Sequence, residues 1–215
     1  MTARDREMSS RAEAAPDPKP DPKPHPELEP TTDLEPGPGH SLRYSFEDPF
    51  ATPAAERRQD RRLRGRLVAP VTVWTAGAGE TRAGLTVASV LVVEGEPPRL
   101  IGAIDPLSDL REAIETAGGP FVVHLLEAGD RALSERFAGS HPGDPFEGLD
   151  VAETEHGPRL AGDRPVALCR LDTVDAVGHL ALVRAVIERI ELAADDRQPL
   201  AYYLGHYRTL SPRSR

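Results

Sequence analysis

The sequence has one cysteine and no long apolar run. Cys169 can form neither an internal disulfide nor a two-cysteine metal site, and its apolar surroundings in PVALCRL favour a buried, inert thiol. A chain without disulfides fits a reducing compartment, so we expect a cytoplasmic protein. No stretch approaches the roughly 18 apolar residues of a membrane span, and residues 1–20 lack the apolar segment of a signal peptide, so we expect no membrane association.

Positive charge is also in short supply. There are 26 Lys and Arg against 35 Asp and Glu, a net charge of -9. This balance argues against nucleic acid as a partner, because that would need a basic face. The arginines in residues 57–64 are interleaved with acids and are typical of a solvated helix face. Lysine occurs only at Lys19 and Lys23, and the preference for arginine, with much Ala, Gly and Pro, indicates a GC-rich bacterial genome.

Several signatures of catalysis and metal binding are missing. The chain has no HExxH, no GxSxG and no Walker-type phosphate loop. Paired metal ligands are absent as well, so we expect no metal site. The AGAGE stretch at residues 76–80 mimics part of a dinucleotide-binding turn, but no helix follows it, which favours a hairpin loop.

The first part of the 215-residue chain differs in composition from the rest. PDPKPDPKPHPELEP alternates proline with charge, so neither helix nor sheet can propagate and little apolar surface can be buried. We therefore expect a disordered, polyproline-like tail over residues 1–45 and one domain over residues 46–215. The tail is either a solubilising spacer or a docking peptide for a proline-recognition domain.

The domain begins with a helix signal and then turns to strands. Thr52 and Pro53 suit a helix start, and the helix should stop near Gly65. VAPVTVWTAG and AGLTVASVLVVEG then predict two strands of a hairpin, and RLIGAI a third strand. PLSDLREAIETAG predicts a helix capped by Ser108 and ended by Gly118 and Gly119.

The second half contains more strands than helices. PFVVHLL predicts a strand with His124 on its solvated face, DRALSERFAG a short helix, and residues 145–163 a loop with short strands. VALCRLDTVDAVGHLALVRAVIERIEL predicts two long strands joined near residues 175–178, and PLAYYLGHYRTL a last strand or an extended tail. The expected fold class is mainly β, a split antiparallel β-barrel with a few short helices.

Two polar stretches are candidate ligand sites. TVAS, residues 86–89, and DPLSDL, residues 105–110, bring hydroxyls to strand ends, and the second leads into a helix N-terminus, which suits a phosphate. Ser108 either caps that helix or binds phosphate beside the cap. His179 follows a Gly turn at a strand start, either as an ordinary surface histidine or as one reaching into a cofactor pocket.

The order of these motifs over about residues 57–210 resembles the flavin reductase-like family with the FMN-binding split-barrel fold. The resemblance implies FMN or FAD as cofactor, NAD(P)H as co-substrate and a homodimer. It places Thr86, Val87, Ala88 and Ser89 along the flavin and its ribityl phosphate, and Asp105, Ser108 and Asp109 over the phosphate side. It places His179, the candidate catalytic residue, near the flavin face where the nicotinamide docks.

The chain departs from the family pattern at a few positions. Ala88 stands where a polar residue is often found, Gly178 where an acid is usual, and Leu204 and His206 where arginines are often found. The resemblance still implies an NAD(P)H-dependent flavin reductase, with a partner monooxygenase as a candidate recipient of reduced flavin. Two alternatives stay open: a flavin-binding carrier or sensor without turnover, and an interaction module whose working part is the tail.

Overall fold

The computed structural model describes residues 59–140, 143–193 and 197–210. The expected tail over residues 1–45 and the predicted start of the first helix lie outside the described residues. Within the described part, no helix is both long enough and apolar enough to span a membrane.

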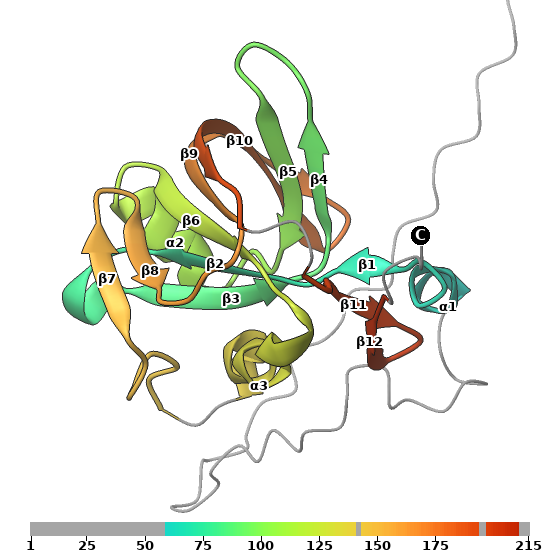
Figure 1. Cartoon of the computed structure of the whole chain (residues 1–215). Helices are drawn as coiled ribbons and strands as arrows, with labels where there is room; N and C mark the ends of the chain where they lie inside the picture. Colours follow the sequence, from blue (N-terminus) through green and yellow to red (C-terminus); the bar gives the residue numbers. More distant parts are fainter. Residues whose placement is uncertain (1–58, 141–142, 194–196, 211–215) are drawn as a thin grey trace, which may run out of the picture. The chain divides into compact units, whose positions relative to one another are not determined.

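A curled antiparallel sheet of seven strands forms the centre of the fold (Figure 1). Its spatial order is β3-β2-β6-β9-β10-β5-β4, so β3 and β4 lie at opposite edges although they follow each other in the sequence. Only Ala88 and Ser89 separate the two strands, and a link of this length spans at most about 11 Å. The sheet must therefore curl until its edges approach, which confirms the expected split barrel. The strands are β2 (Thr72–Ala76), β3 (Ala83–Val87), β4 (Val90–Val93), β5 (Arg99–Ile104), β6 (Pro120–Leu125), β9 (Val166–Val177) and β10 (Leu180–Glu191).

One of the two hairpins predicted from the sequence is present as expected, and the other is present only in part. β9 and β10 pair along their lengths and meet at Gly178 and His179, as predicted. β2 and β3 also form the predicted hairpin, with Thr72 opposite Val87. The second predicted strand, however, breaks at Ala88 and Ser89, and its remainder, β4, pairs with β5 on the far edge of the sheet.

Short elements surround the sheet. The expected helix end near Gly65 is confirmed, and the closing segment is a hairpin rather than one strand, because Leu204 and Gly205 both adopt positive φ and form a tight turn. The short helices and turns are α1 (Gln59–Arg64), η1 (Gly79–Thr81), α2 (Asp109–Thr116), η2 (Ala128–Asp130), α3 (Arg131–Glu135) and η3 (Arg136–Ser140). The short strands are β1 (Ala69–Pro70), β7 (Val151–Thr154), β8 (Gly157–Leu160), β11 (Leu200–Tyr203) and β12 (His206–Thr209).

The two faces of the curled sheet bury separate apolar clusters. On one face, Trp74 stacks on Phe121 with ring centroids 5.1 Å apart, and α2 adds Leu110 and Ile114. Cys169 belongs to this cluster, which confirms the expected burial of the thiol, and burial raises the pKa of that thiol to about 12. The second cluster contains Val71, Val73, Leu126, Phe137, Phe146, Leu160 and Leu200. Because both faces of β2 are covered, each of its five residues is buried.

The prediction for His124 was wrong. Its side chain is fully buried rather than solvated. Nδ1 lies 3.1 Å from the Val73 carbonyl oxygen, and Nε2 accepts a hydrogen bond of 3.1 Å from the Leu160 backbone N–H. The alternating pattern of β6 assigned this side of the strand to solvent, but the β7–β8 hairpin covers it. The neutral imidazole ring therefore bridges the backbone of β2 and the backbone of β8.

Candidate functional site

The predicted flavin residues on β3 and before α2 come together at one end of the sheet. Val90 lies opposite Gly102, and the Ser89 carbonyl accepts a 3.1 Å hydrogen bond from the Ala103 backbone N–H. Since β5 ends at Ile104, residues 105–109 follow at the same end as residues 86–89. We call this end of the sheet the rim.

The turn that carries His179 reaches the same rim. Ala181 of β10 lies opposite Ile104 of β5, so the β9–β10 turn continues beside Asp105. His179 is exposed in this turn. The strand register thus gathers all the predicted site residues, although they come from three separate parts of the chain.

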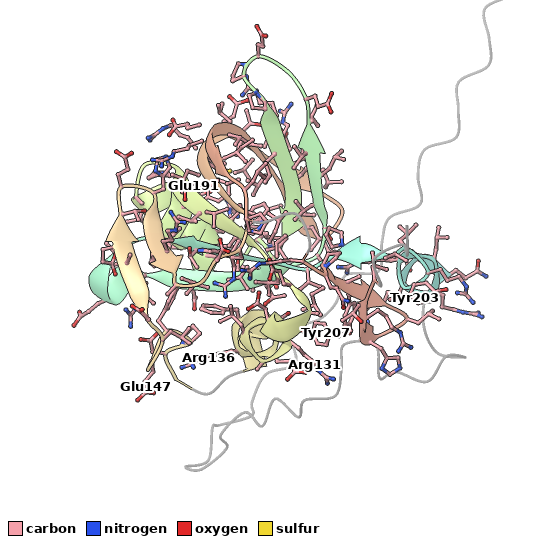
Figure 2. All side chains as sticks on the ribbon, in the orientation of Figure 1. Arg131, Arg136, Glu147, Glu191, Tyr203 and Tyr207 are labelled. Carbon is pink, nitrogen blue, oxygen red and sulfur yellow. The ribbon has the colours of Figure 1, made fainter. Side chains whose placement is uncertain are left out.

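Some of the predicted ligands already have structural partners. The Thr86 hydroxyl donates a 2.7 Å hydrogen bond to the Ser134 carbonyl oxygen, and the Ser134 hydroxyl lies 2.9 Å from the Tyr207 hydroxyl. Figure 2 shows Tyr207 next to α3. Val87 is buried in the core, and its carbonyl accepts a hydrogen bond from the Thr72 hydroxyl. These contacts tie β3 to α3 and the C-terminal hairpin, and a flavin contact of either residue stays a prediction.

Ser108 occupies the cap position that the sequence indicated. Its hydroxyl donates a 2.8 Å hydrogen bond to the Asp105 carbonyl and accepts a longer one, 3.4 Å, from the Arg111 backbone N–H. The Asp105 carboxylate accepts from the Leu107 backbone N–H at 2.8 Å, and Asp109 is exposed in the first turn. The cap accounts for Ser108 by itself, and two carboxylates beside it oppose an anion, so its phosphate contact stays a prediction.

Ser89 has a different neighbour. The Arg64 guanidinium Nη2 lies 3.4 Å from the Ser89 hydroxyl oxygen. Sequence reasoning placed Arg64 on a solvated helix face, and no pattern in the sequence links residues 25 positions apart. Hydroxyl and guanidinium donors are the groups that bind a phosphate monoester well, so this end of the rim fits the phosphate of a flavin mononucleotide.

Two pockets are formed by the described residues. An apolar one of about 200 Å³ is lined by residues of β1, the end of β6 and the start of β11. A more polar one of about 340 Å³ lies beside α3 and includes Asp130 and Arg164. Neither is lined by a predicted flavin residue, although the apolar pocket includes Leu125, which lies opposite Thr72, the partner of Val87.

Comparison with known proteins finds flavin reductases among the relatives of this chain. The chain is 34% identical over 145 residues to the reductase component of 4-hydroxyphenylacetate 3-monooxygenase from Thermus thermophilus, covering 67% of this chain and 91% of that one. It is 31% identical over 164 residues to an FMN reductase (NADH), RutF, from Ancylobacter novellus, covering 74% and 88%.

A solved structure has the same fold. The NADH:FAD oxidoreductase SgcE6 of Streptomyces globisporus, in complex with NAD and FAD fragments, superposes with a TM-score of 0.66 at 24% identity, covering 75% of this chain and 96% of that one. The model of the flavin reductase like domain matches residues 64–211. The chain belongs to the flavin reductase-like family.

Proposed function

We propose that the protein is an NAD(P)H-dependent flavin reductase that binds FMN, or FAD, at the rim. The observation that supports this most directly is the convergence of residues 86–89, residues 105–109 and the His179 turn at one end of the sheet. Family membership and the names of the relatives point to the same reaction.

The chain's part in the reaction is to bind and align. A bound flavin supplies an acceptor for the hydride of the nicotinamide, and this chemistry belongs to the cofactor. Ser89 and the backbone of residues 86–89 would hold the flavin at the rim. His179, exposed beside it, would position the nicotinamide. Hydride transfer depends on proximity and alignment, so the site needs no strong acid or base.

NADH consumption on adding FMN tests this function. The purified protein is expected to oxidise NADH when FMN is present and to show no oxidation when FMN is left out. Loss of absorbance at the NADH band is the measurement, with NADPH and FAD run in parallel to find the preferred pair. A protein that binds flavin without oxidising either nicotinamide would be a carrier or sensor, and one that binds no flavin would contradict the proposal outright.

We also propose a homodimer that completes the rim. Among the described strands β4 lies at an edge with no partner on its outer side, and Leu91 and Val92 are 59% and 55% exposed. An exposed apolar edge strand promotes aggregation unless another element or chain covers it, and a second copy of the same chain is the simplest partner. Since Ser89 directly precedes β4, the second copy would also lie beside a flavin held at residues 86–89.

Sedimentation at micromolar concentration checks the dimer. The unmodified chain is expected to sediment with twice the mass of one chain, and Leu91→Glu to shift it towards the monomer by placing a charge on the apolar edge. Glu94→Gln, just beyond the strand, is the matched control and should stay dimeric. A monomer that binds FMN normally would rule out this assembly.

A partner oxygenase is the expected recipient of the reduced flavin. Relatives with this domain are named as reductase components of monooxygenases, including those acting on 4-hydroxyphenylacetate and on 4-nitrophenol. A cytoplasmic location stays a prediction from the single, buried Cys169.

A further inference from the structure

Arg64 differs from the arginines on the sheet in what it contacts. Most of those arginines pair with a carboxylate, as Arg99 does with Asp172 at 2.8 Å and Arg184 with Asp175 at 2.9 Å. Among the described residues Arg64 has no carboxylate partner, and its guanidinium lies on the Ser89 hydroxyl instead. In a chain of net charge -9, a guanidinium at the rim that has no carboxylate partner in the described part of the chain can pair with an anionic ligand.

The two groups converge as donors. At 3.4 Å their contact is long for a hydrogen bond, so the Ser89 hydroxyl proton and the other guanidinium N–H groups are not committed to each other. Asp60, one turn earlier on α1, directs one carboxylate oxygen to the Arg61 backbone N–H at 2.9 Å. An oxygen-rich anion can therefore accept from both the hydroxyl and the guanidinium.

Both partners are attached to fixed backbone. Gly65, which follows Arg64 directly, accepts a 2.9 Å hydrogen bond from the Leu204 backbone N–H in the turn of the C-terminal hairpin. Figure 1 shows α1 near β11 and β12, in keeping with this backbone contact. Ser89 is held through its carbonyl by Ala103. Arg64 thus reaches the rim from a helix end that the hairpin positions.

We infer that Arg64 and Ser89 together bind the phosphate monoester of FMN, and that Arg64 is the residue by which the protein prefers FMN over riboflavin. The inference rests on the proposed flavin function and adds a residue from outside the strands. A charge-assisted hydrogen bond from a guanidinium to a dianionic phosphate strengthens binding by about ten-fold or more, and riboflavin offers it no acceptor.

Equilibrium binding of FMN and of riboflavin, followed by flavin fluorescence quenching, tests the inference without any turnover. Arg64→Gln is expected to weaken FMN binding about ten-fold or more and to leave riboflavin binding unchanged. Ser89→Ala should act in the same direction. Arg62→Gln, on the same exposed helix and of equal charge change, is the matched control and should keep the affinity for FMN.

The outcomes separate the inference from the proposed function. Equal affinity of the unmodified protein for the two flavins, an equal loss of both in Arg64→Gln, or the same loss of FMN in Arg62→Gln would overturn the role of Arg64. In each of these cases NADH oxidation with FMN would still support a reductase. If the unmodified protein binds neither flavin and oxidises no NADH, the proposed function and the inference fall together.

Discussion

Trp74→Ala is expected to lower the free energy of unfolding by about 3–5 kcal/mol. Trp74 is fully buried, stacks on Phe121, and its indole N–H donates a 3.0 Å hydrogen bond to the Thr72 hydroxyl. The ring also fills the space beside Gly102, where a Cβ would meet it. Truncation would leave a cavity between β2 and β5. These two strands cannot move together to close it, because each is hydrogen-bonded to other strands on both sides.

Urea denaturation at neutral pH measures this loss from the shift of the midpoint at constant slope. Leu192→Ala removes a side chain that is 78% exposed and is the control, with a change within about 0.5 kcal/mol. A loss of less than about 1 kcal/mol for Trp74→Ala would mean that the cluster refills around the missing ring.

Stability is expected to fall as the pH drops from about 6.5 to about 4, because of His124. Burial, its largest cause, lowers the pKa of His124 from 6.5 to about 4, against the opposing hydrogen bond to the Val73 carbonyl. In the unfolded chain this histidine therefore takes up a proton below about pH 6.5. In the folded chain the same side chain stays neutral until about pH 4. Stability is fully present above the unfolded pKa and falls by up to about 1.4 kcal/mol per pH unit, about 3 kcal/mol in all.

Comparison with His124→Gln isolates this contribution. A glutamine amide offers a donor and an acceptor but does not titrate, so the variant should lose less stability than the unmodified chain between pH 7 and pH 5. Carboxylates with lowered pKa values, such as Glu188 beside Arg170 and His156, contribute stability that the protein loses at lower pH. This loss is the same in the unmodified chain and in His124→Gln. Urea midpoints at pH 7, 6 and 5 give the two slopes, and parallel slopes would show that His124 titrates alike in the folded and the unfolded chain.

Features set by neighbouring residues could be predicted from the sequence. The Ser108 cap, the end of α2 at Gly118 and Gly119, and the β9–β10 hairpin each depend on side chains a few positions apart. The motif order then led to the family. The same local patterns placed Asp105, Ser108 and His179 at element ends, and the strand register accounts for the meeting of their segments at the rim.

Features set by distant packing could not be predicted. The alternation in PFVVHLL places His124 opposite the inner face, but only the fold shows that the β7–β8 hairpin covers it. Residues 83–93 read as one strand, because the break at Ala88 and Ser89 arises from the curl that sends β4 to the far edge. Arg64 depends on how α1 docks on the C-terminal hairpin, which its own sequence does not encode.

The order of strands in the sheet has a consequence for synthesis on the ribosome. β5 lies between β4 and β10, so the β4–β5 hairpin lacks its inner neighbour until residues 180–191 have been made. At the usual rate of chain elongation, β10 follows β5 by on the order of 10 s. During that interval Leu100 and Ile104, which are buried in the finished sheet, are still in water. The nascent chain therefore carries unpaired apolar strands in the middle of its synthesis, and the β9–β10 hairpin covers them because it supplies the missing neighbours of β5 and of β6 in one unit.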